Sequence, residues 1–193
     1  LIEQPLLATH EGRVEAILAR GMEVHDILNN PTLDGKTLAG DLKLLQPGSE
    51  RVAIGSRLAQ NLGARVGQRI TVINPAGRTT PFGTVPREIS YEVAAIFEVG
   101  VYDYDKAFVI MPMQNAQQLL LLGDTVGMIE VKTVDADKVG DILAPLADKV
   151  EGKAVVTDWR QMNSSLFEAL QGRYPGGVYA FNHFTISQDP LDN

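Results

Sequence analysis

The sequence predicts an α+β protein made of two lobes. Its 193 residues are enough for one large domain or two small ones. The part before Asp124 is rich in short segments typical of strands, whereas a strand-helix-strand-helix pattern begins after it. Apolar residues make up 45% and charged residues 21%, the balance of a folded protein. We therefore expect a strand-rich lobe over residues 1–124 and an α+β lobe after it.

The first lobe is predicted from alternating apolar and polar residues. Residues 13–21 alternate and end at a glycine, and residues 6–9 precede them across a His-Glu-Gly turn, which indicates a hairpin. Residues 34–40 are expected to form a loop. Further strands are expected over 52–55, 68–73, 90–97 and 107–111.

Two helices are expected in this lobe. Ser56 is a good N-cap for a short helix over 57–62, and Gly63 stands where a left-handed C′ residue ends a helix. A second helix is expected over 114–122, closed by Gly123.

The second lobe is expected over residues 125–171. Its pattern predicts a strand over 128–132, a helix over 139–146 interrupted by Pro145, and a strand over 154–157. Asp158 is a candidate N-cap for a helix that runs to about Leu170. Residues 172–193 are interpreted as a linker followed by a strand over 181–187, or as a tail.

The most unusual segment is residues 74–88. It holds three prolines and two glycines in fifteen residues. Proline removes the N–H donor that a strand ladder needs, so the segment is not expected to be a plain hairpin turn. A connection of this length in a compact domain is usually functional or disordered.

Charge and composition exclude several functions. Acidic residues outnumber basic ones by 24 to 17, so the formal charge of −7 repels polyanions, and nucleic acid is not an expected partner. The absence of cysteine excludes disulfides, thiolate metal sites and thiol catalysis. No glycine-rich phosphate loop occurs, so any ATP hydrolysis must belong to another subunit.

Candidate catalytic and metal residues are few. His10, His25 and His183 are scattered and lack the spacing of a metal site. Ser56 lacks the flanking glycines of a nucleophile elbow. Asp103 and Asp105 are interpreted as part of a polar turn between aromatic residues that pack on the sheet. We expect no enzyme, no cofactor and no metal, and a hydrolase built from distant acids is the last alternative.

No stretch approaches the ~20 apolar residues needed to span a bilayer, and the start does not have the pattern of a signal peptide. The chain also lacks an initiator Met, so it is interpreted as an excised soluble fragment, and any membrane-bound part of the parent protein would lie outside it.

A family resemblance rests on four stretches and their order. They are residues 52–59 (VAIGSRLA), 62–63 (LG), 66–70 (VGQRI) and 80–87 (TPFGTVPR). The sequence resembles the periplasmic domain of LolC/LolE permeases, and residues 95–100, 102–105, 158–159 and 166–167 extend the match.

The resemblance implies a MacB-like periplasmic fold, with a strand-rich Sabre lobe and an α+β Porter lobe set between the first two transmembrane helices of the permease. It places the domain at the periplasmic face of the inner membrane of a Gram-negative bacterium. It also implies a LolD-type ATPase subunit, a second permease subunit and a lipoprotein substrate.

The resemblance further implies that the proline-rich segment is the hook with which LolC-type subunits hold the periplasmic carrier LolA; in LolE-type subunits the domain faces the lipoprotein. An exposed Phe82 and Val85 would anchor the carrier and Arg87 would form a charged rim, whereas the alternative is that Phe82 folds back on the sheet. The carrier-binding residues are expected to be Thr80, Pro81, Phe82, Gly83, Thr84, Val85, Pro86 and Arg87.

One departure and one rival remain. The family begins its Porter lobe with a strand and helix that are missing before Leu1, while residues 182–187 resemble that first strand, so the order is permuted or the segment is a tail. The rival function is an extracytoplasmic domain of a MacB-like exporter or of a cell-division permease, which would bind a different partner.

Overall fold

The computed structural model describes residues 1–81, 83–132, 139–150, 154–158 and 183–188. The chain divides into two compact units, Leu1–Val126 and Gly127–Asn193, close to the position at which the sequence pattern changes. Each unit is described by itself.

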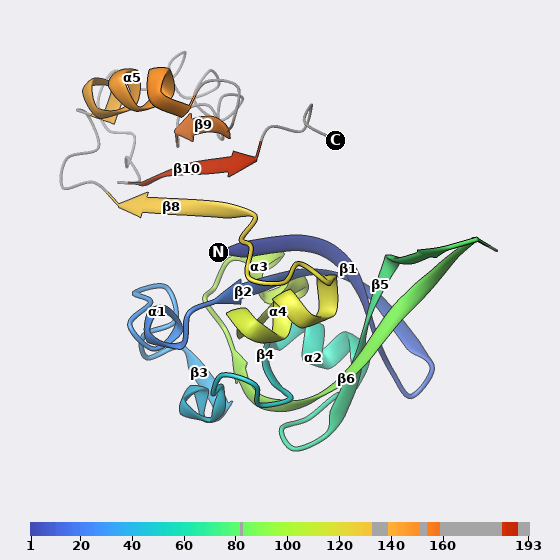
Figure 1. Ribbon diagram of the computed structural model, residues 1–193. Coiled ribbons are helices and arrows are strands. Elements are labelled where there is room, and N and C mark those ends of the chain that lie inside the picture. Colours follow the sequence, from blue (N-terminus) through green and yellow to red (C-terminus); the bar gives the residue numbers. More distant parts are fainter. Residues whose placement is uncertain (82, 133–138, 151–153, 159–182, 189–193) are drawn as a thin grey trace, which may run out of the picture. The chain divides into compact units, whose positions relative to one another are not determined.

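Unit 1 is built on a sheet that closes on itself (Figure 1). Its strands run in the order β3-β6-β4-β7-β2-β1-β5, and β5 also pairs with β6, so all but β3 form a closed ring of paired strands. Closure leaves those six strands few free edges. The strands are β1 (Ile2–His10), β2 (Arg13–Met22), β3 (Thr37–Gly40), β4 (Arg51–Gly55), β5 (Arg69–Thr80), β6 (Gly83–Phe97) and β7 (Phe108–Pro112).

Five short helical segments complete unit 1: α1 (Val24–Leu28), η1 (Leu42–Leu44), α2 (Ser56–Leu62), α3 (Tyr102–Ala107) and α4 (Met113–Leu120). The predicted end of α2 is confirmed, because Gly63 has the left-handed φ of 71°. The cap predicted for Ser56 is wrong. Gly55 is the N-cap, and the Ser56 hydroxyl instead donates to the Glu98 carboxylate at 3.2 Å.

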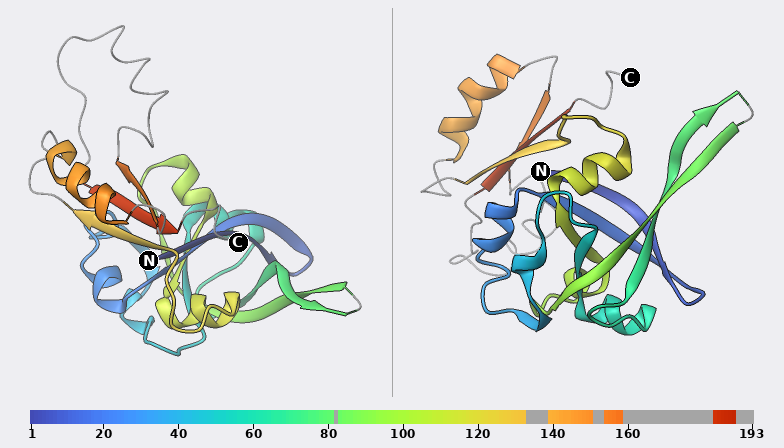
Figure 2. Two further views of the ribbon diagram at one scale, coloured as in Figure 1. Left: turned by 45° about the horizontal axis from the view of Figure 1, so that its top comes forward. Right: turned by 60° about the horizontal axis from the view of Figure 1, so that its bottom comes forward.

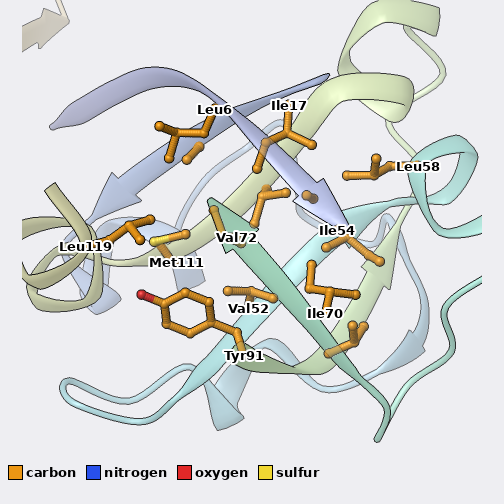
Figure 3. Close-up of a cluster of buried hydrophobic side chains, with 14 of the residues drawn as sticks. Leu6, Ile17, Val52, Ile54, Leu58, Ile70, Val72, Tyr91, Met111 and Leu119 are labelled. Carbon is orange, nitrogen blue, oxygen red and sulfur yellow. The ribbon is translucent and has the colours of Figure 1, made fainter. Parts of the chain in front are cut away.

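The barrel encloses the main hydrophobic core (Figure 3). Val52, Ile54, Ile70, Val72 and Tyr91 lie on its strands and are at most 1% exposed. Full burial of such a side chain contributes about 1.5–3 kcal/mol. This interior is therefore the main source of stability in unit 1, and it fixes the base of the β5–β6 hairpin.

Two loops predicted from the sequence are wrong in detail. Residues 34–40, expected as a loop, contain β3, which forms by pairing with β6. The polar turn expected at Asp103 and Asp105 is the helix α3. Asp105 is 2% exposed, and its carboxylate accepts hydrogen bonds from the Val99 and Gly100 N–H groups at 2.8 and 3.1 Å.

Unit 2 has a three-stranded antiparallel sheet in the order β8-β10-β9, with β8 (Met128–Lys132), β9 (Ala154–Asp158) and β10 (His183–Gln188). The helix α5 (Val139–Val150) continues past Pro145, so the predicted interruption is wrong. In β10, Phe184 and Ile186 are opposite Val131 and Ile129 of β8. The helix expected after Asp158 lies outside the described residues.

Within the described residues, no helix is both long and apolar enough to cross a membrane.

Candidate functional site

Residues 74–88, called the arm below, form the outer half of the β5–β6 hairpin. The segment is a hairpin rather than a long irregular connection, because β5 and β6 pair up to Thr80 and Gly83. It is not a plain hairpin turn, as expected, because a bulge interrupts the pairing between Asn74 and Arg78. Beyond the barrel the two strands pair only with each other among the described residues, and they project as a two-stranded arm (Figure 2).

The arm accommodates its prolines at positions where no ladder hydrogen bond is lost. A bulge places Pro75, Ala76 and Gly77 between the paired residues Asn74 and Arg78, and Pro86 stands opposite that bulge. Pro81 is in the terminal turn. Proline is tolerated at bulges and at free edges, because no donor is required there.

The bulge has a defined structure of its own. The Asn74 side chain is 7% exposed, and its carbonyl oxygen accepts a hydrogen bond from the Ala76 N–H at 3.1 Å. Gly77 has φ 25°, and a Cβ at this position would overlap the Val85 carbonyl oxygen. The bulge therefore requires glycine and fixes the direction in which the arm leaves the barrel.

The tip of the arm is exposed. The Thr80 hydroxyl donates to the Gly83 carbonyl oxygen at 2.7 Å across the turn, and Gly83 has φ 121°. Phe82, the predicted anchor, lies outside the described residues. Of the other predicted carrier-binding residues, Thr80 and Arg87 are half-buried, while Pro81, Gly83, Thr84, Val85 and Pro86 are exposed.

One face of the hairpin changes from apolar to cationic as it leaves the barrel. Along β6, Tyr91, Ile89, Arg87 and Val85 share a face because side chains alternate along a strand. Their opposite residues on β5 are Ile70, Val72, Asn74 and Arg78. The face thus passes from the buried core to two guanidinium groups and an exposed valine.

This face borders a surface hollow of about 480 Å³. Its far side is Leu121, which is 45% exposed and ends α4 with a left-handed φ of 60°. Within the described residues, the Arg87 Nε is buried without a hydrogen-bond partner. The hollow is lined by Arg78, Thr80, Val85, Pro86, Arg87, Glu88 and Leu121.

The arrangement is that of a binding surface. Burial raises the pKa of the Tyr91 phenol far above its usual value; the charge of Arg87 lowers this pKa by a smaller amount, and that of Glu50 raises it. Tyr91 therefore remains neutral. The His10 ring lies 2.9 Å from the Arg69 carbonyl oxygen, and His25 adjoins Asp26. No group of three or more His, Asp or Glu side chains that could hold a metal is found among the described residues.

The predicted carrier-binding residues did not include three residues of this surface, Arg78, Glu88 and Leu121. Arg78 is brought opposite Val85 only by the bulge, which the sequence does not reveal. Leu121 follows Leu119 and Leu120 and precedes Leu122, and four consecutive leucines exceed what one face of a helix can bury. That excess was a usable signal of an exposed apolar position.

Comparison with known proteins gives a family match over most of the chain. The model of the MacB-like periplasmic core domain matches residues 5–149. The chain is 33% identical over 169 residues to the lipoprotein-releasing system transmembrane protein LolC of Neisseria meningitidis serogroup B, covering 87% of this chain and 40% of that protein. It is 29% identical over 159 residues to the protein of the same name from Xylella fastidiosa, covering 82% and 38%.

The chain therefore spans about two fifths of the length of these curated relatives. Among solved structures, the extracellular domain of the noncanonic ABC-type transporter YknZ from Gram-positive bacteria matches with a TM-score of 0.49 and 12% sequence identity. That match covers 78% of this chain and 73% of the other.

Proposed function

Because the chain belongs to the family of MacB-like periplasmic core domains, we propose that it is the periplasmic domain of an ABC transporter permease that releases lipoproteins from the inner membrane. The relatives that support this proposal are named for a lipoprotein-releasing system. The permease lies in the inner membrane of a Gram-negative bacterium. A separate LolD-type subunit hydrolyses ATP, and a second permease subunit completes the transporter.

The role of this domain is to hold the periplasmic carrier LolA while the lipoprotein is transferred. The observation that carries this proposal is the arm, a hairpin that leaves the barrel with its tip in solvent. Val85 is 55% exposed near the tip, although the chain buries its other valines on β5 and β6. An exposed apolar side chain on a defined hairpin is suited to enter a pocket of a partner.

The arm is also preorganised for docking. Its bulge, its prolines and the Thr80–Gly83 hydrogen bond restrict the backbone before any partner binds. Binding therefore orders fewer residues and costs less conformational entropy than docking of a flexible loop. Arg78 and Arg87 add positive charge beside Val85, in a chain whose formal net charge is −7.

A truncated hairpin tests this proposal. Residues 79–84 are replaced by Asn-Gly, so that Arg78 and Val85, which already pair, flank a two-residue turn. We expect affinity for purified LolA, measured by calorimetry, to fall by at least about thirtyfold, the loss typical of one hot-spot residue. The midpoint of thermal unfolding should remain unchanged, because the deleted residues lie outside the barrel.

A matched control alters the other exposed hairpin. Glu11→Asn changes the β1–β2 turn, where Glu11 and Gly12 both have positive φ, and should leave LolA binding unaffected. Normal LolA binding by the truncated chain would remove the arm from the interface. Failure of the intact chain to bind LolA would favour the rival, an exporter or cell-division permease with another partner.

A further inference from the structure

A second exposed surface surrounds β3, on the side of unit 1 away from the arm (Figures 1 and 2). β3 is the outermost strand of the sheet and pairs only with β6 among the described strands. All four residues of β3 are exposed, and Leu38 is 61% exposed. Proteins usually protect such an edge with charges or proline, and the β3 sequence Thr-Leu-Ala-Gly has neither.

A hollow of about 220 Å³ adjoins this strand. Its apolar walls come from Ile27 and Leu28 of α1, from Leu33, and from Leu42 of η1. Ile27 and Leu33 are buried in a second hydrophobic cluster of unit 1, which also contains Leu45 and Phe97, so these walls are held by the packed interior. The hollow is therefore a formed recess that can accept one aliphatic side chain next to an unpaired strand edge.

The lining of the hollow carries one more acidic group than basic groups. Asp34 and Asp41 line the hollow, with Lys43 as the one cation in its lining, and Asp26 lies on α1. The Asp41 carboxylate is held in place because it accepts a hydrogen bond from the backbone N–H of Lys43 at 2.8 Å. A carboxylate rim favours an occupant that carries a basic side chain. An anionic lipid surface would instead require clustered cations.

We propose that β3 and this hollow form a peptide-binding site. An extended segment of another polypeptide adds to the sheet as a strand beside β3, places an aliphatic side chain in the hollow and directs a basic side chain toward Asp34. Backbone pairing at a free edge supplies affinity, and the pocket for an alternate side chain supplies specificity. This site is separate from the arm and does not depend on LolA binding.

The test uses the full 193-residue chain and a fluorescein-labelled heptapeptide that alternates threonine and valine. One valine two positions from the central valine is replaced by arginine, so that the central valine and the arginine lie on the same face of the strand. Fluorescence anisotropy should show saturable binding. Two methylated peptides carry N-methyl groups on alternate backbone amides, one peptide for each edge of the strand. The peptide methylated on the edge that faces β3 should bind at least about tenfold more weakly, because methylation removes the donors that pair with β3. Replacement of the arginine by glutamate should also weaken binding.

Variants of the chain complete the test. Asp34→Lys should weaken the arginine peptide and strengthen the glutamate peptide, a reversal that a purely structural role for Asp34 does not produce. Leu38→Asp should weaken both peptides. Val14→Asp alters a residue that is 58% exposed on another strand, and it should leave both affinities unchanged.

Absence of saturable binding would overturn the proposal. Equal affinity for the peptide and both of its methylated forms, or an Asp34→Lys chain that still prefers arginine, would also overturn it. The chain with the truncated arm should bind the peptide normally. Loss of peptide binding in that variant would place the peptide on the arm and contradict the β3 site.

Discussion

The two ends of the β5–β6 hairpin differ in almost every respect although they share the same two strands. At the barrel end, β5 also pairs with β1 and β6 with β4, and Ile70, Val72 and Tyr91 are at most 1% exposed. At the arm end, the strands pair only with each other among the described residues, and Val85 and Pro86 are exposed. One hairpin thus has a base that stabilises the fold and an exposed tip, to which we assign the proposed carrier binding.

The test with the largest expected effect is the substitution Tyr91→Ala at the base of the hairpin. The side chain is 1% exposed in the main core, and its hydroxyl donates to the Asn115 carbonyl oxygen at 3.3 Å. Truncation of a buried aromatic should lower the free energy of unfolding by about 3–5 kcal/mol, measured by urea denaturation. Val85→Ala at the tip should change it by less than about 0.5 kcal/mol. Similar losses in both variants would show that the arm is part of the folding core.

The local structure of the barrel and its helices was predicted from the sequence more accurately than that of the arm. The strand over 52–55 and the end of α2 at Gly63 follow from local signals, apolar β formers and a glycine at C′, and both are observed. Strand β3 was missed because its pairing with β6 joins residues far apart in the chain. Such long-range contacts, which propensity does not contain, also decide the candidate site.

The arm shows why the candidate site was predicted only in part. Pro75, Pro81 and Pro86 argued against a hairpin, but a bulge and a turn place them where no donor is needed. The exposure of Val85 was expected and is observed. Glu88 was not included in the predicted set, and Arg78 and Leu121 were not predicted because the bulge and the left-handed end of α4 bring them to the hollow.

The second test is Phe82→Ala at the tip. Its neighbours Pro81 and Gly83 are exposed, and we predict that Phe82 is the aromatic anchor for LolA. Affinity should fall by about 2 kcal/mol or more, which is roughly thirtyfold, measured by calorimetry. The unfolding midpoint should hardly change. A variant that melts several degrees lower and binds LolA normally would make Phe82 a core residue and reject the anchor.

A third test uses pH to monitor the base alone. Burial keeps the pKa of Tyr91 above that of an exposed tyrosine, which is about 10. The unfolded chain loses this proton near pH 10 and the folded chain does not, so the stabilisation is complete below pH 10 and declines as pH rises toward the folded pKa. The decline due to this group approaches about 1.4 kcal/mol per pH unit.

The measurement is urea unfolding at pH 9 and at pH 11 for the parent chain and Tyr91→Phe. Ionisation of other groups affects both proteins, so the difference between their slopes isolates Tyr91. The phenylalanine variant should lose less stability between the two pH values. Equal losses would contradict a buried, neutral phenol.

The smallest expected effect concerns Arg87, which stands between base and tip on the face that borders the hollow. A charge at the rim of an interface mainly steers the encounter, so Arg87→Gln should lower the association rate with LolA a few-fold at about 50 mM salt. At about 0.5 M salt the Debye length is short and the difference should vanish. The dissociation rate should change little. Stopped-flow fluorescence at both salt concentrations measures these rates.

Two variants separate charge from packing at this position. Arg87→Lys retains the charge and should restore the association rate, although it loses the planar guanidinium. Arg65→Gln removes an exposed arginine that does not line the hollow and should leave the rate nearly unchanged.

The Arg87 Nε is buried without a partner in the described residues, so an alternative is that Arg87 acts in the bound state through a hydrogen bond to the carrier. In that case Arg87→Gln and Arg87→Lys would both raise the dissociation rate at either salt concentration, and Arg87 would belong to the binding tip rather than to its charged rim.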